Sequence, residues 1–191
     1  MAVIGIIGPM GSGKSYVLES LKGLGANVID CDKLVRELNK VDMPLYNAIV
    51  KEFGSEYIME DRSLNREKLK DKIFNCNEAK KRLNDISGSI VYNYLLGEID
   101  KISGTVFIEG TRIHEAFYEN LFDEYWYVFC DEDTRIERIM QRDNVSKDTA
   151  IIRAKGQKDI VDFKDKCHKI ISSMDEKLIE RLFIEYAKKE K

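Results

Sequence analysis

The sequence has no long hydrophobic run and no paired cysteines. None of its apolar stretches approaches the roughly 18 residues needed to cross a membrane, and no basic segment at the N-terminus precedes an A-x-A cleavage site. The four cysteines are far apart and form no C-x-x-C pair, which is typical of reduced, mostly buried thiols rather than of a disulfide framework. We therefore expect a cytoplasmic protein without a membrane partner.

An excess of basic residues is also absent. The 31 Lys and Arg residues are outnumbered by 34 Asp and Glu residues, and they are spread along the chain. A dedicated nucleic-acid-binding protein normally has a strong basic excess, so no nucleic-acid partner is expected. There are only 2 prolines and no Pro-rich linker, internal repeat or low-complexity tract. The 191 residues indicate one domain, which buries about 70% of its unfolded surface without disulfides.

The sequence that is present begins with a strand, a helix and a second strand. Residues 2–8 (AVIGIIG) are continuously apolar, as in a parallel strand that is buried on both faces. Residues 14–25 place Val17, Leu18, Leu21 and Leu24 on one helical face, and residues 26–30 (ANVID) form a short apolar segment. This order predicts a right-handed βαβ unit with parallel strands.

The rest of the chain alternates in the same way, except for a long helical region. Residues 33–101 are helical in pattern, and Asn65 and Asn77 are the expected N-caps of two helices. Further strands are expected at 105–110, 124–130 and 166–173, and further helices at 133–143, 146–159 and 175–190. The pattern predicts a three-layer α/β core with a helical insertion between its second and third strands.

A phosphate-binding motif connects the first strand to the first helix. Gly8-Pro9-Met10-Gly11-Ser12-Gly13-Lys14-Ser15 fits G-x-x-x-x-G-K-[ST], the P-loop, and Tyr16 follows it. The glycines let successive N–H groups point at phosphate oxygens, and the N-terminus of the helix adds to this field. Lys14 is expected to reach the β- and γ-phosphates of ATP, and the Ser15 hydroxyl to bind Mg²⁺.

A P-loop serves switches, motors and small-molecule kinases. The N-K-x-D motif of GTPases is absent, and the chain is too short for the additional domains of most motors. A small kinase needs an acceptor-binding region and arginines that screen the moving phosphoryl group. Both are available in the helical insertion and in the arginine-rich residues 133–159.

The sequence resembles the dephospho-coenzyme A kinases. The similar segments are residues 8–38, 44–58 (PLYNAIVKEFGSEYI), 62–74 (RSLNREKLKDKIF) and 135–157 (RIERIMQRDNVSKDTAIIRAKGQ). The resemblance implies one P-loop kinase domain over 1–191. Its core covers about 1–32, 104–135 and 160–191, a helical acceptor-binding insertion about 33–103, and a lid about 136–159. The implied reaction moves the γ-phosphate of ATP to the ribose 3′-hydroxyl of dephospho-coenzyme A.

The resemblance also implies roles for individual residues. Asp32 matches the base that faces the acceptor hydroxyl, with Asp30 beside it, and a carboxylate just past a parallel strand is suited to that task. The alternative for either aspartate is a helix cap. Arg142 and Arg153 are the expected transition-state stabilisers, and Arg138 is a weaker candidate. Arg66 and Glu115 match acceptor-binding positions, and the alternative for Arg66 is an exposed arginine in the first turn of a helix.

Three family landmarks are missing. Ser87-Gly88 replace a His-Pro pair, residues 111–115 (TRIHE) replace P-L-L-F-E so that only Glu115 is kept, and His168 and Ser173 replace an Asp and an Asn. Arg112 and His114 add polar groups where the family is apolar, which is either drift at a tolerant rim or a sign of another acceptor, a nucleoside or deoxynucleoside monophosphate. A catalytically silent nucleotide-binding protein is the third hypothesis. Glu109 is expected either near Mg²⁺ or as a cap. The oligomeric state is expected to be a monomer or a weak homo-oligomer.

Overall fold

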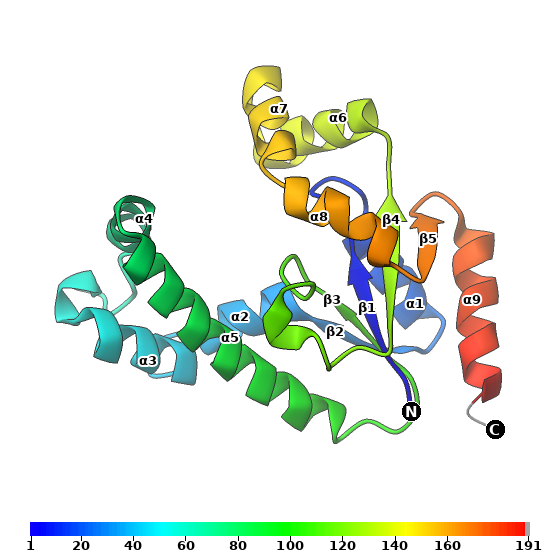
Figure 1. Cartoon of the computed structure of the whole chain (residues 1–191), viewed down its shortest axis with the longest axis horizontal. Helices are drawn as coiled ribbons and strands as arrows, with labels where there is room; N and C mark the ends of the chain where they lie inside the picture. The colour runs from blue at the N-terminus through cyan, green and yellow to red at the C-terminus, as the bar shows by residue number, and fades with distance from the viewer. Residues whose placement is uncertain (190–191) are drawn as a thin grey trace. The chain divides into compact units, whose positions relative to one another are not determined.

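Five parallel strands form one sheet in the computed structural model, which describes residues 1–189 (Figure 1). Their bounds are β1 Val3–Ile7, β2 Asn27–Asp30, β3 Val106–Glu109, β4 Glu124–Phe129 and β5 Lys169–Ser172. They lie in the order β2-β3-β1-β4-β5, and every neighbouring pair is parallel. All residues of the central strand β1 are buried, as its unbroken apolar sequence predicts. The expected α/β fold with a parallel sheet is confirmed.

Helices cover both faces of this sheet. On one face, α1 (Lys14–Gly23) and α9 (Glu176–Lys189) share an apolar core with the strands. Within this core the ring of Trp126 packs edge to face against Phe107 and Tyr186, at centroid distances of 5.2 and 5.5 Å. On the other face lie α8 (Lys158–Asp162) and η3 (Phe163–Lys166), where the Phe163 ring is 5.1 Å from Tyr125 (Figure 1). The sheet is therefore the middle of three layers.

The carboxyl ends of the strands carry the polar groups. The register pairs Asp30 with Glu109, the last residues of β2 and β3, and β1 ends at Ile7 next to them. Ligands of open parallel sheets bind outside this edge. The loop after β1 and both carboxylates therefore belong to one edge of the sheet.

Residues Cys31–Asp100 form one compact unit, and the rest of the described chain forms another. The helices of this unit are α2 Cys31–Leu38, α3 Pro44–Phe53, η1 Ser55–Tyr57, α4 Arg66–Asn75 and α5 Asn77–Ile99. Its core includes Leu38, Leu45, Ile49 and Leu95, which are all buried. Along the chain, this helical unit follows β2 and precedes β3. The other unit also contains η2 Ala116–Tyr118, α6 Glu132–Asp143 and α7 Lys147–Lys155.

Two details of the predicted helices are wrong. Asn65 caps α4 and accepts a hydrogen bond from the Lys68 N–H at 3.0 Å, but Asn77 is the first residue of α5 and not its cap. Only Cys76 separates α4 from α5, so it takes the extended cap position itself. The helix expected over 146–159 is interrupted at Gly156 and Gln157. Glycine weakens the helix there, and the side chain of Gln157 bonds elsewhere.

The environment of the cysteines differs in part from expectation. All four are free thiols, but only Cys31 is buried, whereas Cys76, Cys130 and Cys167 are half-buried. The latter three lie at the ends of helices or strands, where packing is less complete. No helix in residues 1–189 combines the length and the apolar character that a membrane span requires.

We predict that the aromatic core dominates the stability of the sheet. Phe107→Ala should lower the free energy of unfolding by about 3–5 kcal/mol, because it leaves a cavity against Trp126. Chemical denaturation followed by circular dichroism measures this change. Phe74→Ala is the matched control, since Phe74 is 85% exposed and its loss should change stability by less than about 0.5 kcal/mol. Similar losses in both variants would contradict the assignment of the core.

Candidate active site

The loop after β1 has the conformation that its glycines predict. Gly11 and Gly13 have φ angles of 80° and 96°, in the left-handed region that residues with a Cβ rarely adopt. Gly8 has no room for a side chain, because a Cβ there would lie 2.6 Å from the carbonyl oxygen of Val128. Gly13 is the N-cap of α1, so the first N–H groups of this helix are at the loop. The backbone therefore requires glycine at each of these positions.

Lys14 and Ser15 are the first two residues of α1. The Lys14 side chain is buried, and its Nζ donates a hydrogen bond to the carbonyl oxygen of Pro9 at 3.4 Å. The Ser15 hydroxyl donates to Oε2 of Glu109 at 3.4 Å. The ammonium group is thus held against the loop's own backbone, and the hydroxyl stands beside a carboxylate.

The carboxylate of Glu109 is a site feature that the sequence left undecided. Glu109 is only 5% exposed, and it ends β3 directly opposite Asp30 in the register. Its contact with Ser15 places it at the P-loop rather than at the cap of a later turn. The signal in the sequence was its position as the last residue of a buried parallel strand.

Two arginines of α6 contact the P-loop backbone. Arg135 Nε donates to the carbonyl oxygen of Met10, and Arg138 Nη1 donates to that of Gly11, each at 3.1 Å. Gln157 accepts a hydrogen bond from the Met10 N–H at 2.5 Å. A pocket of about 480 Å³ adjoins the loop; it is lined by Gly11, Gly13, Lys14, Ser15, Arg138, Gln141 and Arg142. The weaker candidate Arg138 is therefore a pocket residue.

The two lid arginines expected to stabilise charge share one partner. Arg142 donates to Asp143 at 2.7 Å, and Arg153 forms an ion pair with the same carboxylate. The hydrogen bond from Arg142, aided by Arg153, lowers the pKa of Asp143 below its ordinary value. Arg142 lines the pocket, whereas Arg153 is outside its lining. Both side chains are more than 40% exposed, so neither is locked in the core.

Tyr16 follows Ser15 in α1, and Ser173 lies against Gly13 and accepts a hydrogen bond from Arg138 Nη1 at 3.5 Å. The Tyr16 hydroxyl bonds to Glu176, and this hydrogen bond raises the pKa of the phenol. Tyr16 is half exposed and outside the pocket lining. Ser173 is buried, and its Oγ would lie 2.4 Å from a Cβ on Gly13. The small side chain at 173 therefore packs directly beneath the P-loop.

Asp32 and Arg66 belong to the compact unit Cys31–Asp100. Asp32 is in the first turn of α2, two residues after the end of β2. Arg66 is the first residue of α4. It lines a pocket of about 730 Å³ within this unit, together with Arg36, Asn39, Lys40, Val41, Met59, Ser63, Leu64, Asn65 and Glu67.

Two unusual polar residues after β3, and His168 before β5, are paired within the protein. Arg112 contacts Glu115 through two hydrogen bonds of 2.6 and 2.8 Å. His114 Nε2 lies 3.2 Å from Oδ2 of Asp159, and its ring packs on Phe163 with a side chain that is only 9% exposed. His168 Nδ1 accepts a hydrogen bond from the N–H of Tyr125. Each of these groups therefore has a structural partner close by.

Sequence reasoning missed Arg135 and the packing role of Ser173. Arg135 is 7% exposed, which is unusual for an arginine, yet it stands in a helix that otherwise looks solvated. Its spacing of three residues from Arg138 was the available signal, because that spacing puts both on one helix face.

The model of the dephospho-CoA kinase family matches residues 2–176. The chain belongs to the dephospho-CoA kinase family. Membership assigns an ATP-dependent kinase activity toward dephospho-CoA, so the expected function is confirmed.

Curated dephospho-CoA kinases are similar over nearly the whole chain. The enzyme of Streptococcus pneumoniae strain R6 is 34% identical over 174 residues, which are 90% of this chain and 87% of that enzyme. The enzyme of Halalkalibacterium halodurans is 31% identical over 175 residues, with the same coverage of 90% and 87%. The similarity therefore spans the P-loop, the helical insertion and residues 133–159.

Solved structures support the same fold. A dephospho-CoA kinase from Campylobacter jejuni matches with a TM-score of 0.66 and 25% identity, covering 98% of this chain and 97% of that one. A Thermus thermophilus protein matches with a TM-score of 0.80 and 23% identity at the same coverage. A shikimate kinase from Acinetobacter baumannii matches with a TM-score of 0.57 and 17% identity, over 97% and 94% of the two chains. The last two show the fold alone, which is that of P-loop kinases.

We predict that Gly13 tolerates no side chain. Gly13→Ala should lower the free energy of unfolding by at least about 1–3 kcal/mol and weaken nucleotide binding, because of its φ angle and its contact with Ser173. Thermal denaturation and ADP titration measure the two effects. Gly23→Ala is the control in the same helix: nothing lies within 4 Å of a Cβ there, so stability should be unchanged or slightly raised. Normal ADP binding by Gly13→Ala would refute the required loop geometry.

Proposed function

We propose that this kinase transfers the γ-phosphoryl group of ATP to the 3′-hydroxyl of dephospho-coenzyme A at the pocket over the P-loop, with Mg²⁺ bound at Ser15. The observation that carries this proposal is the convergence of Lys14, Ser15 and Arg138 on one pocket above the glycine loop. Phosphoryl transfer depends on positioning and on charge stabilisation, and these groups supply both.

The residues beside Ser15 suit a magnesium ion. Mg²⁺ prefers oxygen ligands and is usually held by one or two carboxylates together with substrate phosphates. The Ser15 hydroxyl and the buried Glu109 carboxylate are in contact, and Asp30 ends the neighbouring strand. A magnesium ion held by these residues would supply positive charge that neutralises the nucleotide phosphates. Ser15 is the direct ligand in this proposal, and the two carboxylates act on the ion directly or through water.

Cations around the pocket are proposed to stabilise the transferred group. Lys14 is buried next to the loop, and Arg138 is held at the carbonyl of Gly11. Arg142 is also at the pocket, and it shares Asp143 with Arg153. A phosphate that competes with Asp143 for these two guanidinium groups would draw them toward the nucleotide, because phosphate accepts bidentate hydrogen bonds as well as carboxylate does.

The acceptor is proposed to bind the helical unit. Its 730 Å³ pocket collects three cations, Arg36, Lys40 and Arg66, which suit the diphosphate of dephospho-coenzyme A. Asp32 is proposed to accept the proton of the ribose hydroxyl, since a carboxylate is the general base that the first turn of α2 offers. Glu115 is proposed to help position the acceptor while paired with Arg112.

A different acceptor has little support. The hypothesis of a nucleoside or deoxynucleoside monophosphate came from the altered acceptor positions Ser87-Gly88 and 111–115, where Arg112 and His114 were expected to add polar groups. Arg112 is paired with Glu115, and the nearly buried His114 is paired with Asp159. Dephospho-coenzyme A is therefore the proposed acceptor.

We further propose that the enzyme works in the cytoplasm as a monomer or a weak homo-oligomer. Its four free cysteines agree with a reducing compartment.

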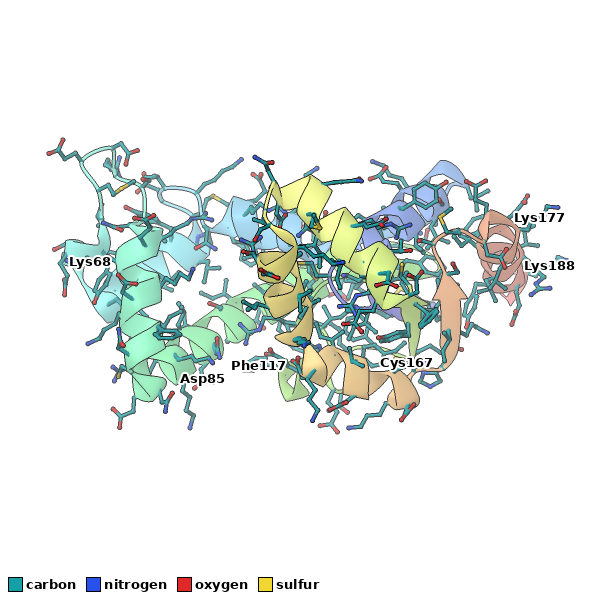
Figure 2. All side chains as sticks on the ribbon, turned by 90° about the horizontal axis from the view of Figure 1, so that it is seen from above. Lys68, Asp85, Phe117, Cys167, Lys177 and Lys188 are labelled. Carbon is teal, nitrogen blue, oxygen red and sulfur yellow. The ribbon has the colours of Figure 1, made fainter. Side chains whose placement is uncertain are left out.

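Lys14→Ala should lower turnover by at least about 10²-fold, because one preorganised charge-stabilising donor has an effect of that size. The assay couples ADP release to ATP·Mg²⁺ and dephospho-coenzyme A, with a panel of nucleoside monophosphates as alternative acceptors. Lys177→Ala is the control, since Lys177 points outward from α9 (Figure 2) and should leave turnover unchanged. An unchanged rate in Lys14→Ala would refute the phosphate site, and turnover with a nucleoside monophosphate alone would refute the acceptor.

Substitutions of Asp30 and Asp32 should have different effects on the Mg²⁺ concentration that the enzyme requires. Asp30→Asn should raise the Mg²⁺ concentration needed for half-maximal rate, because Asp30 is paired in register with Glu109. Asp32→Asn should lower kcat by about 10²-fold or more at unchanged Mg²⁺ requirement, because only the proposed base is altered. Magnesium titrations at saturating ATP measure both. The reverse pattern would exchange the two roles.

A further inference from the structure

The first two turns of α6 hold the P-loop by its carbonyl oxygens. Arg135 and Arg138 are three residues apart on one face of the helix, and they donate to the consecutive carbonyls of Met10 and Gly11. The backbones also touch, because a Cβ on Gly11 would lie 2.7 Å from the carbonyl oxygen of Arg135. The helix that leads into the lid is therefore in direct contact with the loop that receives the phosphates.

Met10 is held at both of its backbone groups. Its N–H donates to the side chain of Gln157, and its carbonyl oxygen accepts from Arg135. The peptide bond is planar and trans, so a carbonyl turned toward Arg135 directs the Gly11 N–H to the opposite side. The orientation of the Met10–Gly11 peptide thus depends on the guanidinium of Arg135.

Gly11 allows the Met10–Gly11 peptide plane to rotate at low energetic cost. Rotation of the Met10–Gly11 peptide changes ψ of Met10 and φ of Gly11, and glycine accepts φ angles of either sign. Gly11 has a φ of 80° in this structure. Without a donor at the Met10 carbonyl, nothing in the chemistry of Gly11 itself selects the orientation in which its N–H is presented as a phosphate ligand.

Stability does not explain why an arginine occupies position 135. Its side chain is 7% exposed, and its Nη2 is buried with no hydrogen-bond partner in the described structure. A buried cation with an unsatisfied N–H is costly, and an apolar side chain of similar size is often as stable or more so. The arrangement is the one expected where a donor is kept for its effect on a neighbouring group.

We infer that Arg135 is a positioning residue for ATP: it fixes the Met10–Gly11 peptide so that the Gly11 N–H is presented to the nucleotide phosphates. It acts through the loop and does not touch the reacting atoms. This inference rests on the proposed nucleotide site at the P-loop, and it adds to that site a residue outside the P-loop motif.

Arg135→Met should raise KM for ATP by about tenfold, the effect of losing one charge-assisted hydrogen bond. The KM for dephospho-coenzyme A should stay within twofold of that of the unchanged enzyme, and kcat within about threefold. Arg135→Lys retains one donor and should recover part of the affinity for ATP. Arg181→Met, an exposed substitution on α9, is the matched control and should alter none of these constants.

The urea midpoint and the Gly11 amide resonance distinguish a positioning role of Arg135 from a packing role. The urea midpoint of Arg135→Met should be equal to or above that of the unchanged enzyme. In protein labelled with ¹⁵N-glycine, ADP·Mg²⁺ should shift the Gly11 amide resonance strongly in the unchanged enzyme and weakly in Arg135→Met. A lower midpoint with unchanged KM for ATP, or equal Gly11 shifts in both proteins, would overturn the inference.

Failure of the inference can be told apart from failure of the proposed function. If the unchanged enzyme itself neither binds ADP·Mg²⁺ nor turns over ATP, the nucleotide site is wrong. If the unchanged enzyme is active and Arg135→Met has the same KM for ATP, only the role of Arg135 is wrong. Should Arg135→Met fail to fold, Arg135→Lys and Arg135→Gln test the same expectation, with KM for ATP rising in the order Arg, Lys, Gln.

Discussion

Phosphate charge has to be balanced at the carboxyl end of β1, and most of the described active site follows from this constraint. The backbone N–H groups of a glycine loop and the N-terminus of α1 meet that charge without any side chain. Lys14 adds a full positive charge from the first turn of the same helix, and Arg138 adds another from α6. The carboxylate of Glu109 contacts the Ser15 hydroxyl, where a magnesium ion would offset its negative charge next to the phosphates.

Such a loop works only if it is rigid, and the sheet provides the rigidity. β1 lies between β3 and β4 with all of its residues buried, and the aromatic cluster around Trp126 fixes the sheet beneath the loop. The loop itself is enclosed by close contacts: Val128 faces Gly8, and Ser173 lies under Gly13. A preorganised loop of this kind does not need to reorganise when charge moves during phosphoryl transfer, which is the condition for electrostatic catalysis.

The helices after β4 contain arginines that are bound to the P-loop and arginines whose ion pairs a ligand can replace. The first turns of α6 are tied to the P-loop through Arg135 and Arg138. Its last turn carries Arg142, which is exposed and paired with Asp143, the residue that also binds Arg153. Ion pairs at exposed positions contribute little to stability, so a ligand can replace them at small cost. Anchored arginines can therefore shape the loop while exposed ones remain available to a substrate.

The sequence by itself determined the order of the elements and the chemistry of the loop. Its apolar runs predicted the five strands, because a strand that is buried on both faces is apolar at nearly every residue. Its helical patterns predicted the insertion, because a helix that is buried on one face repeats its apolar residues every three to four positions. The P-loop could be recognised from its glycines, because its backbone conformation at these positions is one that other residues rarely adopt. Asn77 and the break at Gly156 were misjudged because a cap or an interruption depends on the neighbouring helix and on partners such as Met10.

Only the tertiary structure decided which polar groups meet. Glu109 was ambiguous until the register placed it opposite Asp30 and against Ser15, and Arg138 could not be told from a solvated arginine until α6 lay on the loop. Arg112 and His114 looked like new acceptor contacts, but Glu115 and Asp159 pair with them. The burial of Arg135 was signalled in the sequence only by its spacing of three residues from Arg138. The physical reason is common to all of these cases. Hydrogen bonds and ion pairs act over a few ångströms, and residues far apart in the chain come this close only after the layers have packed.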